Sequence, residues 1–498
     1  MRTHITRGLG VALACAAGCG GPTDEAPRRP DVVMIVVDTL RADRLSCYGY
    51  DRPTSPRIDG FAREGAVFLD TTSQWPWTLP SMVSIFQGRY ITNYRDRLTE
   101  EHPSLPELFL DAGYRTVGIV ANCSVDEGQG FTRGFERFDI SPCWRNENGK
   151  AQYIRDIGEI EGLVPELAGD LLADENRQPL FLYIHAYEPH SPYRGHAQYD
   201  ELLPIDQTLG VQPEGWREEA IAQAGPKNRK GKTSWKGDFE AIDNQRGFYD
   251  QEIRWFDTGL GRIVDSLKEA GLSEDAVFAL ASDHGEGLWE HITNDTPEAL
   301  STYGPAEFFY QLHGGNGYEP VMATPMLVWG TRVPSGQKVQ APVENVDLFP
   351  TLLDLCDIPL PGDLHGRSLV PLLEGSPPED WREFVFCYGS HNLSVRHAES
   401  SWKLVLPHGL RSEATGRKPE LFRLSDDPYE RNDLSAENPE IVAWLVAEAG
   451  AWMDRHPTVS SMKGRMSELN KQGRDQLAEK LRALGYTELE TGLPTGQE

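Results

Sequence analysis

Four unbroken runs of apolar residues define the predicted framework of the chain. Each run is rich in Val, Ile, Leu, Phe or Ala, without the alternation of polar residues that marks a half-exposed strand. Parallel strands covered by helices on both faces carry such continuous runs. The pattern therefore predicts buried strands at residues 31–38, 116–121, 180–185 and 276–282.

Helical patterns separate these predicted strands. In residues 248–270 the apolar side chains recur at intervals of three and four, which places Ile253, Phe256, Leu260 and Ile263 on one face of a helix. Alternation of strands with helices predicts a mostly parallel α/β sheet. Ligands of such sheets bind beyond the carboxyl ends of the strands, and the predicted strands are followed there by polar residues such as Asp38, Asn122, Asp283 and His284.

Residues 75–90 hold a second helical segment, which begins near Pro80 and ends at Gly88. Proline is favoured in the first turn of a helix, and glycine is favoured just after the last turn. Thr78 is therefore expected just before a helix N-terminus, where free backbone N–H groups favour an anion. Two interpretations follow. Thr78 caps the helix, or its hydroxyl meets a phosphate or sulfate group.

Composition narrows the possible partners. The chain has 498 residues, is 39% hydrophobic and carries a formal net charge of −28, enough for a large core but unsuited to general nucleic-acid binding. An anionic substrate would need a locally positive site.

One basic segment, residues 226–237, is interpreted either as a contact for an anionic glycan or lipid head group or as a solvated loop. The aromatic residues in 292–312 suggest a lid.

The N-terminus is typical of an exported protein. Arg2 and Arg7 precede a short apolar stretch, and residues 16–19 (Ala-Ala-Gly-Cys) resemble a bacterial lipobox with Cys19 as the lipidated residue. We therefore expect a signal peptide at 1–18, a tether at 19–30 and an exported lipoprotein of the cell envelope; an ordinary cleaved signal peptide is the alternative. The remaining cysteines show no zinc-binding pattern and allow up to two disulfides, whose pairing stays open.

Several motifs, in order, resemble the sulfatase branch of the alkaline-phosphatase superfamily, over about residues 31–445. The matching motifs are Val36-Val37-Asp38-Thr39-Leu40-Arg41, Thr78-Leu79-Pro80-Ser81 with Gly88-Arg89-Tyr90, Glu188-Pro189-His190-Ser191-Pro192, Ser282-Asp283-His284-Gly285-Glu286, and His313-Gly314-Gly315-Asn316-Gly317-Tyr318-Glu319. Trp402-Lys403-Leu404 and residues 420–430 resemble the C-terminal part of the family. The resemblance implies an α/β fold of alkaline-phosphatase type, with a mostly parallel sheet between helices, in a catalytic domain at 31–375. It also implies a small C-terminal α+β subdomain at 376–460, and a polar helical tail is expected at 461–498.

The resemblance also implies the site residues. One divalent-metal site would be formed by Asp38, Thr78, Asp283 and His284, with Thr78 as nucleophile. His190 and His313 match family positions that contact the anion or the leaving group, and Asn122 falls near a substrate-binding position. His185 and His291 fit the family positions less well and are expected, at most, to orient ligands.

Two departures from the sulfatase pattern change the expected chemistry. Sulfatases carry Cys or Ser at the position of Thr78, which becomes formylglycine, and Arg at the position of Met82. Threonine cannot form that aldehyde, whereas a plain threonine nucleophile is found in the phosphodiesterases and phosphotransferases of the superfamily. His284 adds a nitrogen ligand, which favours zinc or manganese over calcium or magnesium.

These features predict metal-dependent hydrolysis or transfer at a phosphate or sulfate ester through Thr78, with phosphoesters, particularly diesters, preferred. The expected substrate is an anionic ester of a glycan, lipid head group or small molecule. We also expect the N-terminal lipid to anchor the protein to a membrane. One alternative is a sulfuric ester hydrolase that works on a sulfated glycan or lipid without formylglycine. The other is a catalytically silent lipoprotein that binds an anionic glycan, an interpretation that Met82 keeps open.

Overall fold

An eight-stranded sheet organises the fold, with β1 (Val32–Val37) near its centre. The computed structural model describes residues 29–91, 97–140, 155–173, 177–205, 239–292, 309–389, 392–407 and 418–456. The strand order is β11-β2-β10-β7-β1-β6-β4-β5. The other strands are β2 (Gly65–Phe68), β4 (Arg115–Val120), β5 (Arg137–Ile140), β6 (Leu180–Ala186), β7 (Val277–Ser282), β10 (Met326–Trp329) and β11 (Gln337–Val339).

The sheet is mostly parallel, as the sequence predicted. β1 runs parallel to both β6 and β7, and β4 runs parallel to β5 and β6. Only β10 is antiparallel to its neighbours, β2 and β7. The four predicted strands correspond to β1, β4, β6 and β7, each within one residue or so of the expected ends.

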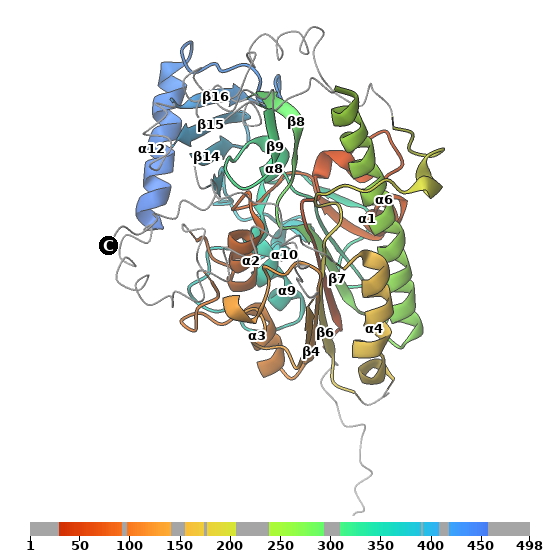
Figure 1. Cartoon of the computed structure of the whole chain (residues 1–498). Helices are drawn as coiled ribbons and strands as arrows, with labels where there is room; N and C mark the ends of the chain where they lie inside the picture. Colours follow the sequence, from red (N-terminus) through yellow and green to blue (C-terminus); the bar gives the residue numbers. More distant parts are fainter. Residues whose placement is uncertain are drawn as a thin grey trace, which may run out of the picture.

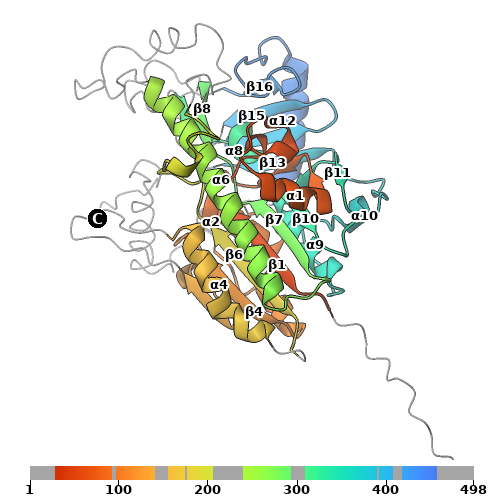
Figure 2. The same cartoon turned by 90° about the vertical axis from the view of Figure 1, so that its right-hand side faces the viewer.

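Helices cover both faces of this sheet (Figures 1 and 2). One face packs against α1 (Pro56–Glu64), α4 (Ile157–Leu172) and α6 (Phe239–Glu269). The other packs against α2 (Thr78–Gln87), α3 (Leu105–Asp111), α9 (Leu348–Leu355) and α10 (Val370–Leu373). Side chains of a strand alternate between faces, so Val33 and Ile35 of β1 join the first core while Met34 and Val36 join the second. This explains why β1 is apolar throughout.

A second, antiparallel sheet forms the C-terminal part of the described chain, and α12 (Pro439–Arg455) packs against it (Figure 1). Its strands are β13 (Phe384–Tyr388), β14 (Asn392–His397), β15 (Trp402–Pro407) and β16 (Glu420–Arg423). Ion pairs with buried cations join the two parts, since Lys403 Nζ lies 3.0 Å from Glu319 Oε2 and Arg396 pairs with Asp70. Smaller elements are β3 (Thr71–Thr72), β8 (Gly287–Ile292), β9 (Phe309–Leu312), α8 (Glu319–Met322) and β12 (Val343–Glu344).

Several sequence-based expectations fall outside the described residues. These are the signal peptide, Cys19 and most of the tether, the basic segment 226–237, residues 293–308 of the expected lid, and the C-terminal tail. The described ends of that lid segment belong to β8 and β9, which pair antiparallel. Cys123 is disulfide-bonded, whereas Cys47, Cys356 and Cys387 are free. Among the helices of the described ranges, none combines the length and the apolar character that crossing a membrane requires.

Candidate active site

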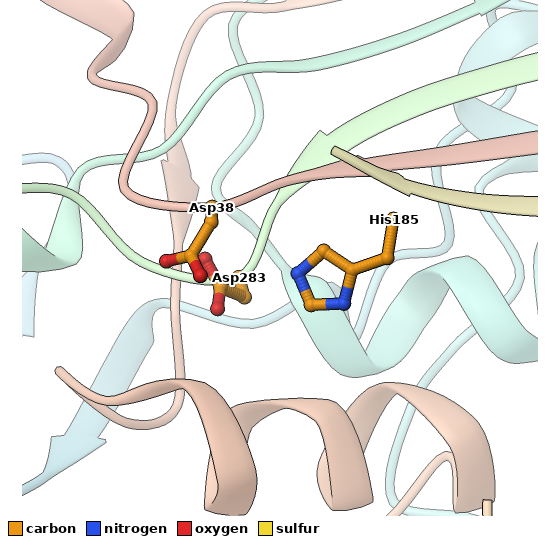
Figure 3. A group of neighbouring side chains, drawn as sticks. All are labelled: Asp38, His185 and Asp283. Atoms are coloured by element: carbon orange, nitrogen blue, oxygen red, sulfur yellow. The ribbon is translucent and has the colours of Figure 1, made fainter. Parts of the chain in front are cut away.

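Three adjacent strands bring Asp38, His185 and Asp283 together at the carboxyl edge of the sheet (Figure 3). Asp38 follows β1, Asp283 follows β7, and His185 is the penultimate residue of β6. One potential ligand atom from each of these buried side chains lies within 4.8 Å of the others. Acidic and imidazole groups therefore lie close together at the carboxyl ends of the parallel strands, which is the position predicted for the site.

Hydrogen bonds hold the turns after β1 and β7 in register. The Thr39 N–H donates to Asp283 Oδ1 at 3.2 Å, and the Leu40 N–H donates to Ser282 Oγ at 2.9 Å. Thr39 adopts a left-handed backbone with φ of 57°, which a β-branched residue rarely does. The surrounding contacts therefore fix an unfavourable conformation that directs the chain past Asp283.

The remaining polar atoms of these residues face a common centre. Asp38 Oδ1 and Asp283 Oδ2 are buried without a hydrogen-bond partner. His284 Nδ1 lies 2.9 Å from the Gly285 carbonyl, so it carries the proton, and Nε2 presents its lone pair. That Nε2 lies 3.5 Å from Asp283 Oδ2 and 3.8 Å from Asp38 Oδ1. Carboxylate oxygens and a neutral imidazole nitrogen at this spacing fit a divalent cation.

One interpretation of the sequence was that Thr78 caps the helix. Thr78 is instead the first residue of α2, so it does not occupy the capping position. The capping position belongs to Trp77, and Thr78 Oγ1 instead lies 3.3 Å from His284 Nε2. Ser81 anchors the helix, because its hydroxyl donates to the Asp283 carbonyl at 2.6 Å. Gly88 ends the helix in a left-handed conformation, as expected. Thr78 is only 1% exposed, and its hydroxyl thus lies beside the candidate ligand atoms of Asp38, Asp283 and His284.

Burial perturbs the ionisation of the site. Burial, with the nearby carboxylate of Asp283, places the pKa of Asp38 well above its usual range, and burial raises the pKa of Asp283 to about 7. The same burial, with His313 nearby, holds the pKa of His284 well below its ordinary value. Two carboxylates and a neutral imidazole in a desolvated space need a cation for both acids to ionise.

His190 and His313 lie beside this centre. Their ring centroids are 4.9 Å apart, and those of His284 and His313 are 4.4 Å apart. His190 Nδ1 is 2.6 Å from the Ser191 carbonyl and Nε2 has no hydrogen-bond partner, while burial and His313 depress its pKa well below normal. The free Nε2 of His190 is therefore an acceptor.

Glu286 was missed by the sequence interpretation. Its fully buried Oε1 lies 3.0 Å from His313 Nδ1, which leaves Nε2 on the opposite side of the ring. A carboxylate there fixes the ring and compensates the positive charge that His313 acquires when it holds two protons. The available signal was the position of Glu286, two residues after His284 at the end of a buried strand.

The C-terminal sheet supports the loop that follows His313. Ser394 Oγ donates to the Gly317 carbonyl at 2.7 Å, and Asn392 Oδ1 accepts from the Gly317 N–H at 2.9 Å. Asn392 Nδ2 also donates to Asn316 Oδ1. β14 therefore positions a loop of the site from the second sheet.

The other predicted residues have different surroundings. Asn122 is buried, and its Nδ2 donates to Asp38 Oδ2, a contact with an expected metal ligand. Met82 is fully buried in the apolar core beneath α2. His291 lies in β8, and its side chain is outside the described residues.

The arrangement is a possible site for a divalent cation, with the Thr78 hydroxyl beside it, in a fold of alkaline-phosphatase type. Comparison with known proteins makes this more specific. The model of the sulfatase family matches residues 30–358, and that of the N-sulphoglucosamine sulphohydrolase C-terminal region matches residues 316–447. The chain therefore belongs to the sulfatase family of metal-dependent ester hydrolases.

Individual relatives are distant but extend over most of the chain. A sulfatase of Formosa agariphila is 24% identical, covering 80% of this chain and 83% of its own. An N-acetylglucosamine-6-O-sulfatase of Bacteroides thetaiotaomicron is 23% identical, covering 86% of both chains. The solved phosphonate monoester hydrolase of Silicibacter pomeroyi superposes with a TM-score of 0.64 at 21% identity, over 87% of this chain and 97% of its own. The last similarity confirms the alkaline-phosphatase-like fold.

Proposed function

We propose that the protein hydrolyses or transfers phosphate esters, with diesters preferred, through a covalent intermediate on Thr78. The observation that carries this proposal is the contact of 3.3 Å between Thr78 Oγ1 and His284 Nε2 at the start of α2. Asp38, Asp283 and His284 would hold a divalent cation there. When bound, this cation would offset the charge of the substrate and lower the pKa of the Thr78 hydroxyl.

The reaction divides into two displacements. The Thr78 hydroxyl loses its proton to solvent, and its oxygen attacks phosphorus while the ester bond to the leaving alcohol breaks. His313, held by Glu286, gives a proton to the departing oxygen. Water or a second alcohol then gives its proton to His313 and attacks phosphorus while the bond between phosphorus and Thr78 Oγ1 breaks, and the Thr78 oxygen regains a proton from solvent. His190 accepts a hydrogen bond at Nε2 from a hydroxyl of the substrate alcohol or from the attacking water, since its depressed pKa keeps the free ring neutral.

A second candidate function is the cleavage of sulfate esters, which family membership and the relatives named as sulfatases favour. This chain would then have to hydrolyse a sulfated threonine, because Thr78 cannot become formylglycine. Both candidate functions use the same residues and the same class of substrate, an anionic ester, which includes esters of glycans. A third possibility is that the protein is a lipoprotein that binds an anionic glycan and has no catalytic activity.

The donor atoms favour zinc or manganese. The imidazole of His284 is a better ligand for these ions than for calcium or magnesium, which prefer oxygen. Asp283→Ala removes a carboxylate from the centre, so the variant should lose bound metal and activity together. Full metal occupancy in Asp283→Ala, measured by elemental analysis, would exclude this ligand assignment.

A substrate panel tests the reaction. Aryl phosphate, phosphodiester, phosphonate monoester and aryl sulfate are compared with wild-type protein, Thr78→Ala and Thr78→Ser, all loaded with metal. We expect phosphodiester turnover in the wild type, partial turnover in Thr78→Ser and a loss of several orders of magnitude in Thr78→Ala. Acid quenching followed by mass spectrometry should find phosphate on Thr78. Wild-type turnover by folded Thr78→Ala would refute the proposal, and turnover of sulfate alone would favour the second candidate.

A further inference from the structure

His185 has an unusual environment for a histidine within a sheet. The side chain is fully buried, and neither ring nitrogen has a hydrogen-bond partner. An imidazole removed from water without compensating hydrogen bonds is costly in free energy. A structure that retains it there needs a partner for at least one of the two nitrogens.

The register of the strands fixes the direction of this side chain. His185 of β6 pairs with Val36 of β1, so the two side chains leave the sheet on the same face, the face covered by α2. Asp38 lies two residues after Val36 along the chain. Figure 3 shows a nitrogen of the His185 ring facing the carboxylates of Asp38 and Asp283.

Each residue of this cluster has polar atoms without a partner. They are Asp38 Oδ1, Asp283 Oδ2 and the two nitrogens of His185, of which one faces the carboxylates. One atom from each residue lies within 4.8 Å of the others. Three ligand atoms spread evenly about 2.0–2.2 Å from one ion lie up to about 3.8 Å apart, so shifts of about half an ångström per side chain would suffice to bring all three onto it.

We propose that His185 is a further direct ligand of the same divalent cation, beside Asp38, Asp283 and His284. This inference rests on the cation site of the proposed function but not on the reaction assigned to Thr78. A ligand set of two imidazole nitrogens and two carboxylates is softer than the set without His185, which has two carboxylates and one imidazole. The set thus disfavours calcium and magnesium more strongly and selects zinc, manganese or a similar transition ion.

X-ray absorption spectroscopy counts imidazole ligands directly. The full-length protein is stripped with a chelator and reloaded with Zn²⁺ or Co²⁺. The wild type should show two imidazoles, and His185→Gln should show one. His397→Gln is the matched control, since His397 lies in β14 and bonds Ser400 Oγ, so this variant should keep both imidazoles.

Metal affinity gives a second measurement, by competition with a chromophoric chelator. His185→Gln should lose more than about 100-fold, beyond the loss of about 10- to 100-fold typical of residues that only orient a ligand. An unchanged imidazole count in His185→Gln, whatever its affinity, would refute direct ligation. If that variant does not fold, the wild-type spectrum decides, because a single imidazole refutes the inference and two support it.

The two proposals fail in different ways. A protein with two imidazoles on the metal and no turnover of any ester in the panel would retain this inference and reject the proposed reaction. Turnover through Thr78 with one imidazole on the metal would do the reverse. Thr78→Ala should bind the metal with both imidazoles in either case.

Discussion

Asn122 donates a hydrogen bond of 2.5 Å from Nδ2 to Oδ2 of Asp38, while its own Oδ1 accepts from the Ser124 N–H at 2.8 Å. Both polar groups of the amide are therefore engaged within the protein. The contact leaves Asp38 Oδ1 as the free oxygen that faces the cation site. Asn122 is predicted to bind substrate, and we propose from this contact that it also orients Asp38, an expected metal ligand.

Asn122→Ala should therefore weaken metal binding by about 10- to 100-fold, because Asp38 loses the group that fixes its carboxylate. With saturating metal, KM for the best substrate should stay within about twofold of wild type. Chelator competition and steady-state kinetics measure the two effects. A raised KM with unchanged metal affinity would restore the substrate-binding role.

Glu286→Gln tests the proton donor. The carboxylate 3.0 Å from His313 Nδ1 balances the charge of the protonated ring, so its loss should slow cleavage of an alkyl ester about 10- to 100-fold. A 4-nitrophenyl ester needs no proton on its leaving group and should lose far less. Equal losses on both esters would show that His313 does not protonate the leaving group.

Met82→Arg tests whether the arginine of sulfatases fits this site. Met82 is 0% exposed and packs in the apolar core beneath α2, so a buried guanidinium there should destabilise the fold by several kcal/mol. Met82→Leu, the matched control, should cost less than about 1.5 kcal/mol. Denaturant unfolding measures both variants. An arginine variant of normal stability with increased sulfatase activity would contradict the expectation.

Glu188 should make stability depend on pH. Burial, with the carboxylate of Glu252 nearby, raises its pKa to about 8 from an ordinary value of 4.5. The folded state therefore holds a proton that the unfolded state releases between pH 4.5 and 8, so this group lowers the free energy of unfolding as pH rises through that range. Glu188→Gln resembles the protonated acid. It should be more stable than wild type at pH 8, by an amount on the order of 4 kcal/mol, and equal to it near pH 4.

The measurement for Glu188→Gln is denaturant unfolding at several pH values. Glu188 Oε1 accepts from the Ile157 N–H at 2.9 Å, and the glutamine oxygen can keep this bond. A difference in stability that does not vary with pH would mean that Glu188 ionises normally.

Residues 1–28 are outside the described chain, and we propose that Cys19 carries a lipid after removal of residues 1–18. Residues 19–30 would then tether a catalytic domain at 31–375 and a subdomain at 376–460 to the cell envelope. The wild-type protein should partition into detergent, and Cys19→Ala should release it in soluble form. Soluble behaviour of both proteins would support an ordinary cleaved signal peptide instead.

The sequence was most informative where burial imposes a simple pattern. Val32–Val37 had to be apolar on both faces, so its strand could be recognised without its neighbours. The short strand Gln337–Val339 has exposed lysine and glutamine and no such pattern, and only pairing with β2 defines it. Helix α6 begins at Phe239, earlier than the expected 248, because its first turns contain many polar residues.

Within the site, the sequence indicated which residues lie together better than it indicated their local geometry. Asp38, Thr78, Asp283 and His284 lie together, but the position of Thr78 inside α2 depends on where the first helical hydrogen bond forms, from the Ser81 N–H to the Trp77 carbonyl. The contacts of Glu286 with His313 and of Asn122 with Asp38 could not be predicted, because the two residues of each pair are remote in sequence. The position of His185 beside Asp38 could not be predicted for a similar reason, since only the pairing of β6 with β1 brings the two residues together.

The separation between Asp38 and Asp283 along the chain has a consequence for how the protein acquires its ion. Their strands pair only after more than half of the polypeptide has been made, so no shorter nascent chain can form the chelating centre. Unfolded chains lack such a preformed site, and metal uptake is therefore coupled to closure of the sheet. The ions available in the compartment where folding finishes, rather than at the ribosome, would then decide which metal the mature protein carries.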